Sequence, residues 1–499
     1  MMLAWQRLEG LILLAALMAL ATTVSPARVR DRRLYVNTCW SGLPSFQTTE
    51  KFDQYLAVST GHGFNALSID IPWTIQKPDG SYDFSRSDER IDQIVRAGLP
   101  AFVRLKTMFA WGERTPWAKD EHLACLAGGE IYYRDERKAA VPSISHPAVR
   151  REMVKFYRAV AQHYAQRYPD RLPIVAYSAA WSLTAESEYM HDADIDYSPA
   201  AQKDFRQWLR RRGETLATLS QRWGKPLNSW QQVTLEAAHR TDFYRFGEYT
   251  LRRSFHELKQ ALRAGDSRAA FGVQFGCIWD NPNRRVSHAT DVSQDADWIF
   301  IADAPLYPHR FSTDFLRGLC RGRYGSNEMD GPGAHGASNE VYLQQGTQMW
   351  EHGADAVFLC NWLLNPLEDP KYTFLSRLGE LAKQPPTAPQ PKRAIYLSSW
   401  DIYNGEGVGV YREAYDEIAD RGKGPVDVIN DAVILEGPAY LARYSEGIVL
   451  PHNRHLSPEV RAVIEKITVP VTVLNPQIAG TRDDYGRETD PLRVPRTGG

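Results

Sequence analysis

The chain has 499 residues, of which 43% are hydrophobic and 24% charged, and its formal net charge is −1. These proportions are typical of globular proteins, so wholesale disorder is excluded. The near-zero net charge argues against nucleic acid as the main partner, because phosphate binding needs a concentrated basic field. A chain of this length exceeds one ordinary hydrophobic core, and we therefore expect one large and one smaller domain.

The N-terminus has the pattern of a secretory signal. Arg7 precedes an apolar run over residues 11–24, and the small residues Ser25 to Ala27 follow it. This order of charge, apolar run and small residues predicts a signal peptide over 1–27 and a secreted or periplasmic protein, with an uncleaved membrane anchor as the alternative. No other apolar run approaches the roughly 20 residues that a membrane span requires.

The cysteines and acidic runs do not predict a metal or cofactor. The five cysteines are widely spaced and form no C-x-x-C pair, which favours buried free thiols over a zinc site. The series Asp192, Asp194, Asp196 resembles the start of a calcium loop, but Tyr197 and Lys203 stand where the loop needs glycine and glutamate. We therefore expect no cofactor and no bound metal.

Short apolar segments alternate with amphipathic helices over most of the chain. Helices are predicted near residues 52–59, 88–97, 147–168, 199–213, 242–264 and 340–352. Eight strand-and-helix units over about 350 residues match a (β/α)8 TIM barrel, whereas a doubly wound sheet seldom needs eight units. The predicted strands are 34–37, 66–71, 101–105, 174–182, 270–275, 297–302, 323–328 and 356–361.

A proline-rich linker over 385–392 separates this barrel, residues 28–384, from a second unit. Residues 393–478 contain four short apolar segments with helical stretches between them, which predicts a small flavodoxin-like parallel α/β domain. The tail over 479–499 is polar and charged, and we expect it to be disordered.

Two acids fall at predicted strand ends, where barrels carry their chemistry. Glu186 follows the fourth strand and Glu328 ends the seventh. Glycoside hydrolysis needs such a pair, because one acid protonates the departing oxygen while the other attacks the sugar carbon or activates water. The structural alternatives are that Glu186 is a solvated loop acid and that Glu328 pairs with Arg321 or Arg323.

Several stretches also resemble the β-galactosidases of glycoside hydrolase families 42 and 35. The resemblance implies a retaining glycoside hydrolase that acts on β-linked sugars of an oligo- or polysaccharide, with Glu186 as general acid/base and Glu328 as nucleophile. It also implies a TIM barrel followed by a flavodoxin-like domain, and it leaves monomer and oligomer as alternatives. The stretches are residues 65–73 with 78–84, 198–199 with 205–209 and 219–224, 326–329, and 352–357 with 361–362.

The chain departs from this pattern at the acid/base. The usual Asn-Glu pair is here Ala185-Glu186, so the asparagine that would bind the 2-hydroxyl of the sugar is missing. Glu188, two residues on, competes for the acid/base role, although the match of position favours Glu186. The missing asparagine also keeps open an inactive carbohydrate-binding barrel in exopolysaccharide handling, and an endo-acting polysaccharide hydrolase is a further alternative.

Other residues at strand ends are candidates for binding the substrate. Arg104 would hold a carboxylate ionised or form a structural ion pair, and Tyr307 resembles a tyrosine that is aimed at the nucleophile but equally fits a rim position. Tryptophans at strand ends would stack on a sugar ring unless they belong to the core. The candidates are Trp73, Arg104, Trp181, Glu188, Tyr307, Asn327 and Trp362.

Overall fold

The computed structural model describes residues 32–37, 48–109, 113–134, 139–181, 186–189, 193–276, 292, 294–301, 309–331, 337–360, 372–385, 389–420 and 424–494. The expected signal peptide therefore lies outside the described residues. Within the described part of the chain, no helix combines the length and the apolar character that crossing a bilayer requires.

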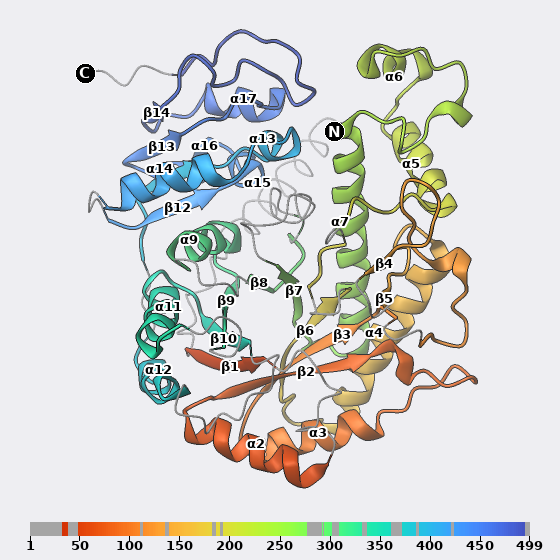
Figure 1. Ribbon diagram of the computed structural model, residues 1–499, viewed down its shortest axis with the longest axis vertical. Helices are drawn as coiled ribbons and strands as arrows, with labels where there is room; N and C mark the ends of the chain where they lie inside the picture. The colour runs from red at the N-terminus through yellow and green to blue at the C-terminus, as the bar shows by residue number, and fades with distance from the viewer. Residues whose placement is uncertain are drawn as a thin grey trace, which may run out of the picture.

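Eight parallel strands close into a barrel, which confirms the predicted (β/α)8 fold (Figure 1). They follow one another around the barrel in the order β1, β10, β9, β8, β7, β6, β3, β2, and β1 closes the ring by pairing with both β10 and β2. The strands are β1 (Arg33–Asn37), β2 (Ala66–Pro72), β3 (Ala101–Lys106), β6 (Ile174–Ala180), β7 (Phe271–Phe275), β8 (Trp298–Ile301), β9 (Tyr324–Asp330) and β10 (Ala356–Cys360).

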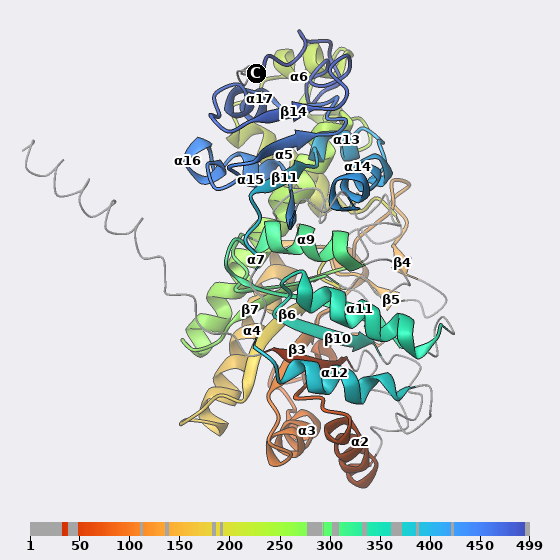
Figure 2. The same cartoon turned by 90° about the vertical axis from the view of Figure 1, so that its left-hand side faces the viewer.

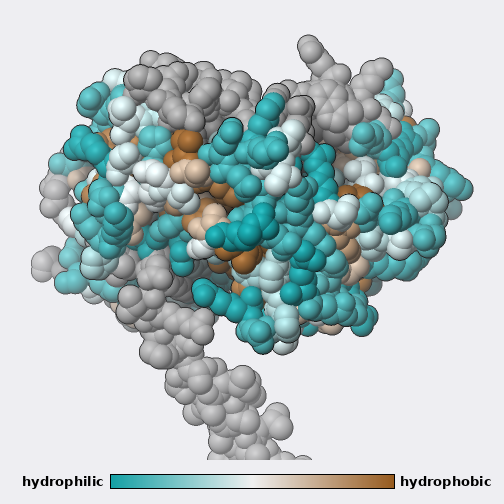
Figure 3. Space-filling view, turned by 90° about the horizontal axis from the view of Figure 1, so that it is seen from below, coloured by the Kyte–Doolittle hydropathy of each residue, from teal (hydrophilic) through white to brown (hydrophobic). Residues whose placement is uncertain are grey.

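Helices cover the outside of the barrel. Most begin at a side-chain cap, as Ser198 does for α5 by accepting the Ala201 N–H at 3.2 Å. On the face seen in Figure 3, hydrophilic residues predominate and hydrophobic residues form small separate groups. The helices are α2 (Thr49–Gly61), α3 (Ser85–Arg96), α4 (Pro147–Arg167), α5 (Pro199–Arg211), α6 (Leu216–Trp223), α7 (Arg240–Gly265), α9 (His309–Cys320), α11 (Asn339–Glu351) and α12 (Phe374–Ala382).

The barrel interior is filled by every second residue of its strands, as the pleat of a strand requires. Tyr35, Phe102 and Phe358 meet there with Trp298 and Phe300, and the Tyr35 and Phe358 rings stack at 4.3 Å. All five side chains are at most 5% exposed. The inward positions nearer the carboxyl ends of the strands, such as Arg104 and Lys106 beyond Phe102, therefore point into the mouth.

The second domain is a four-stranded parallel sheet in the order β12, β11, β13, β14. Its first strand lies between the second and the third, which is the order of a flavodoxin-like sheet. The elements are β11 (Arg393–Tyr396), α13 (Ser399–Tyr403), α14 (Gly409–Asp420), β12 (Val426–Ile429), α15 (Asp431–Ile434), α16 (Pro438–Leu441), β13 (Gly447–Leu450), α17 (Pro458–Ile464) and β14 (Val471–Val473).

Helix α9 lies between the two domains, as Figures 1 and 2 both show. Arg317 of α9 donates to Asp427 at 2.8 Å and to the Val426 carbonyl at 2.9 Å. A side chain at Gly318 would collide with the Val428 carbonyl, so the helix and β12 pack backbone against backbone. The barrel and the second sheet are thus joined by a buried, charge-paired contact.

The expectation of a disordered tail is wrong for residues 479–494. Tyr485 donates to Asp242 of α7 at 2.8 Å, the Asp484 carbonyl accepts from Thr241 at 2.6 Å, and Asp484 pairs with Arg245. Polar composition suggested disorder because it offers little apolar surface to bury. Here the charged side chains instead find partners on a barrel helix, and the segment ties the second domain to α7.

Burial of Asp431, at the carboxyl end of β12, gives a testable pH dependence. Desolvation raises the pKa of this carboxyl from 3.8 to about 6, although Tyr396 and the Ser399 N–H donate to it. The folded protein holds this proton more tightly than the unfolded chain, so its stabilising effect is complete below pH 4 and is lost as the pH rises through 6.

We expect the free energy of unfolding of the native chain to fall by about 2 kcal/mol between pH 4 and 6.5 relative to Asp431→Asn, which has no titrating group there. Denaturant unfolding of both proteins across this range measures the difference. Parallel pH profiles would contradict the expectation.

The cysteines Cys125, Cys320 and Cys360 are buried and carry free thiols. This agrees with the expectation for these three, and Cys39 and Cys277 lie outside the described residues.

Candidate active site

Glu328 occupies the inward face of β9 at the mouth of the barrel. Tyr324 and Ser326 precede it at two-residue intervals, and Ser326 accepts the indole N–H of the interior residue Trp298 at 2.7 Å. The alternation of the strand therefore directs Glu328 inward. Its side chain is only 3% exposed.

Glu328 is held from behind by Asn327. The Asn327 side-chain oxygen accepts the Glu328 N–H at 2.8 Å, and its nitrogen donates to Ser312 and Thr313 of α9 at 3.0 and 3.1 Å. His309 of the same helix contacts the Glu328 carbonyl at 3.0 Å. Asn327 thus points away from the mouth, so its expected contact with substrate is wrong, and its amide fixes the strand backbone instead.

The segment that follows β6 rejoins the barrel wall in an unexpected register. In a parallel ladder, the Gln274 carbonyl of β7 should accept the N–H two residues beyond Ala179, which is that of Trp181. The Trp181 N–H instead donates to the Glu186 carbonyl at 2.9 Å, and Gln274 accepts from the Ser187 N–H at 2.5 Å. Ser187 therefore takes the ladder position that Trp181 would otherwise hold.

Glu188 consequently lies beside the end of β7. Its Oε2 accepts the Gly276 N–H at 2.8 Å, and its side chain is 1% exposed. Phe275 pairs with Ile301 of β8, which pairs with Asn327, so Gly276 and Glu328 both lie one position beyond the same rung of the sheet. The register therefore places the Glu188 carboxyl at the end of β7, two strands from β9, which carries Glu328.

Glu186 is also buried, at 7% exposure, so it is not the solvated loop acid of the alternative. Arg321 and Arg323, which the alternative pairs with Glu328, instead precede the amino end of β9 and have partners there. Arg321 pairs with Glu436, and Arg323 donates to the backbone carbonyls of Cys320 and Leu319. Ala185 lies outside the described residues.

A buried ion-pair group stands on the opposite wall of the mouth. Arg104 and Lys106 of β3 pair with the two oxygens of Asp70 on β2, at 2.7 and 2.6 Å. Arg104 has no exposed surface. The ion-pair alternative for Arg104 therefore fits the structure, and Asp70 and Lys106 are polar residues of the mouth that sequence reasoning missed.

The expectation that Trp73 and Trp181 stack on a sugar is wrong. Trp73 is fully buried against Phe109 and Trp117, with ring centroids at 5.9 and 5.0 Å. Trp181 is 2% exposed and stacks on Phe255 of α7 at 5.3 Å. Both indoles belong to the core.

Tyr307 and Trp362 lie outside the described residues. Gln274 was not foreseen. It is buried at an inward position of β7, below the contact between Glu188 and Gly276. The two-residue alternation of that strand could have predicted that its side chain faces the barrel interior.

A closed parallel barrel with a carboxyl group after its fourth strand and another at the end of its seventh has the arrangement of the barrel glycosidases. The site belongs to that class by its geometry.

The comparisons with known proteins agree with this class. The family model described as Beta-galactosidase, glycoside hydrolase family 42, matches residues 44–366, well over half of the chain. The chain belongs to this family.

Curated relatives share a shorter stretch. Beta-galactosidase BbgII of Bifidobacterium bifidum is 26% identical over 227 residues, which are 44% of this chain and 29% of that protein. Beta-galactosidase BgaB of a Geobacillus strain is 24% identical over 220 residues, 40% and 30% of the two chains. The matched part therefore spans less than a third of either relative.

Solved structures share the fold over nearly the whole chain. A β-galactosidase from the Antarctic haloarchaeon Halorubrum lacusprofundi superposes with a TM-score of 0.71 at 16% identity, covering 92% of this chain and 75% of that one. One from the psychrophilic Marinomonas ef1 gives 0.68 at 17% identity, covering 92% and 78%. These likenesses support the barrel and the second domain together.

Proposed function

We propose that the protein is a retaining glycoside hydrolase that cleaves β-linked sugars, with β-galactosides as the first class of substrate. The single observation that carries the proposal is the register that sets the Glu188 carboxyl at Gly276 and sets Gly276 and Glu328 one position beyond the same rung of the sheet. Family membership and the names of the relatives support the sugar class.

Glu328 is the nucleophile in this proposal. Its carboxylate attacks the anomeric carbon while the acid/base protonates the glycosidic oxygen, so the leaving group departs as a neutral alcohol. The resulting glycosyl ester is cleaved by water, which gives its proton to the acid/base and regenerates the Glu328 carboxylate. Asn327 and α9 hold the Glu328 backbone in place during both steps.

Glu188 is the acid/base in this proposal, because the hydrogen-bonding register of the backbone supports it. The match of sequence position had favoured Glu186 instead. Ser187 restores the ladder, so Glu188 is the first acidic side chain of the restored wall. The Gly276 N–H orients its carboxyl, and a neutral carboxyl can accept this bond through its carbonyl oxygen. The contact thus fits both the protonated and the ionised form that the cycle needs.

Hydrolysis of a panel of aryl β-glycosides tests the function. Proton NMR early in the reaction identifies the anomer of the sugar that is released. We expect turnover of the β-galactoside and release of the β-anomer, which then mutarotates. Release of the α-anomer would contradict the retaining mechanism. Oligosaccharide binding without hydrolysis of any glycoside would contradict the enzyme and favour the binding barrel.

We further propose that the protein is exported, on the support of the N-terminal pattern of residues 1–27. Peptide sequencing of the mature N-terminus tests this, with a start near Arg28 as the expected result and an intact Met1 as the contrary one.

A further inference from the structure

The carboxylate of Asp196 joins four separate segments of the barrel. Its Oδ1 accepts the N–H groups of Cys125 and Ser198 at 3.1 and 2.8 Å, and its Oδ2 accepts from the Ser143 hydroxyl at 2.5 Å. The Tyr189 hydroxyl lies 3.3 Å from Oδ2. Asp196 is the last acid of the calcium-like series, and in the structure both of its carboxylate oxygens accept hydrogen bonds from protein groups.

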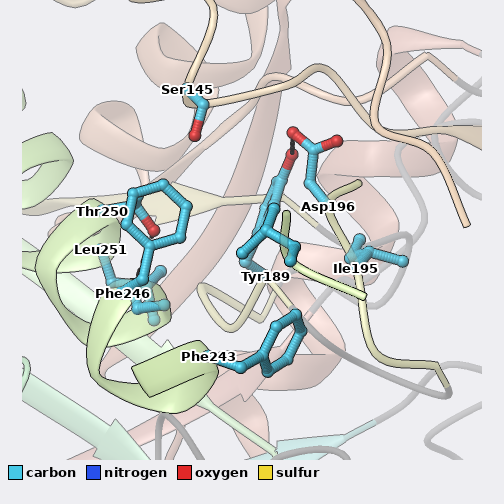
Figure 4. A pocket seen from close by; sticks show the side chains of 10 residues that line it. Ser145, Tyr189, Ile195, Asp196, Phe243, Phe246, Thr250 and Leu251 are labelled. Atoms are coloured by element: carbon cyan, nitrogen blue, oxygen red, sulfur yellow. Dashed lines mark hydrogen bonds between the residues drawn. The ribbon is translucent and has the colours of Figure 1, made fainter. Parts of the chain in front are cut away.

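Tyr189 follows Glu188 directly and anchors the end of the segment that carries it. Its hydroxyl lies 3.0 Å from the Pro142 carbonyl and accepts the Ile144 N–H at 3.3 Å. Figure 4 shows the hydroxyl directed at the Asp196 carboxylate. Glu188 is thus held on one side by Gly276 and on the other by the bonds of Tyr189.

The ring of Tyr189 borders a cavity of about 20 Å³, which is room for about one water molecule. Phe243, Phe246 and Thr250 of α7 line its far side (Figure 4). Because the ring is not closely packed on that side, the bonds of its hydroxyl help to fix its position.

We propose that Asp196 and Tyr189 form a clamp that positions the carboxyl of Glu188 for proton transfer to the leaving group. The inference rests on the proposed function. Both are positioning residues, because they act on the substrate through Glu188 rather than by touching it. Proton transfer needs a carboxyl within hydrogen-bond reach of the leaving oxygen, and a small displacement of the segment lengthens that distance.

The variants Tyr189→Phe and Asp196→Ala test the clamp. Tyr411→Phe is the matched control for the first, since Tyr411 is a buried tyrosine of the second domain whose hydroxyl likewise donates to a buried carboxylate, that of Asp401, at 2.6 Å. Asp204→Ala is the control for the second, since Asp204 is a buried acid of α5 that pairs with Arg253.

We expect kcat/KM for an alkyl β-galactoside to fall roughly tenfold or more in both clamp variants. A dinitrophenyl β-galactoside, whose leaving group needs no proton, should change less than about threefold in the glycosylation step. If these residues served stability alone, kcat/KM would fall by the same factor for both substrates, and we expect this equal effect in the two control variants. Equal loss on both substrates in the clamp variants would overturn the inference.

Amide hydrogen exchange gives a readout that does not depend on turnover. We expect the Ser187 and Gly276 amides to exchange faster in Tyr189→Phe than in the native chain and in Tyr411→Phe. Unchanged exchange at both amides would overturn the clamp. Absence of any glycosidase activity in the native chain would instead overturn the proposed function, and exchange would still decide the clamp.

Discussion

Replacement of Glu328 by alanine is expected to lower kcat on an aryl β-galactoside by roughly 10⁴-fold or more, because no other group can form the glycosyl ester. Sodium azide should restore turnover by entering the space that the carboxylate leaves. The product should then be the α-galactosyl azide, since a single displacement inverts the anomeric carbon.

Glu340 is an exposed residue at the start of α11, and Glu340→Ala is the control for removing a carboxylate outside the site. It should keep native turnover. Unchanged activity in Glu328→Ala would remove the nucleophile assignment, as would azide rescue that gives the β-galactosyl azide.

Replacement of Glu188 by alanine should produce a different pattern. Proton transfer by a side chain contributes roughly 10²- to 10⁴-fold, so alkyl β-galactosides should lose about that much. The dinitrophenyl galactoside should still form the glycosyl enzyme at a rate near that of the native chain. Azide should accelerate breakdown of this intermediate and give the β-galactosyl azide, because two displacements restore the configuration.

Glu186→Ala is the matched comparison, since Glu186 is a buried acid two residues away in the same segment. If Glu188 is the acid/base, Glu186→Ala should show neither the leaving-group dependence nor azide rescue. The reverse pattern would assign the role to Glu186, as the sequence position suggested.

The barrel could be predicted because its strands are short, apolar and regularly separated by amphipathic helices. Helix α9 was missed although its apolar residues Phe311, Phe315 and Leu319 recur at the helical spacing of four, so the period of its sequence was an available signal. Sequence alone does not reveal that ten of its twelve residues are buried, between the barrel and β12.

The site was predicted in outline, because acids at the carboxyl ends of strands four and seven follow from chain order. Its details depend on register and orientation, which sequence patterns do not encode. Ser187 takes the ladder place of Trp181, and this changes which glutamate lies on the barrel wall. Likewise Trp73 lies near the end of β2 but stacks on Phe156 of α4, and Asn327 of β9 donates to α9, since a shift of one residue along a strand reverses the face.

Covalent trapping tests the central claim most directly. A deoxyfluorogalactosyl fluoride forms its ester with the nucleophile rapidly and loses it slowly. The fluorine on the sugar ring destabilises the oxocarbenium-like transition states of both steps, but the fluoride leaving group speeds only the first step, so the ester accumulates. Digestion and mass mapping should place the label on Glu328. A label on any other residue, or active protein that takes up no label, would contradict the account.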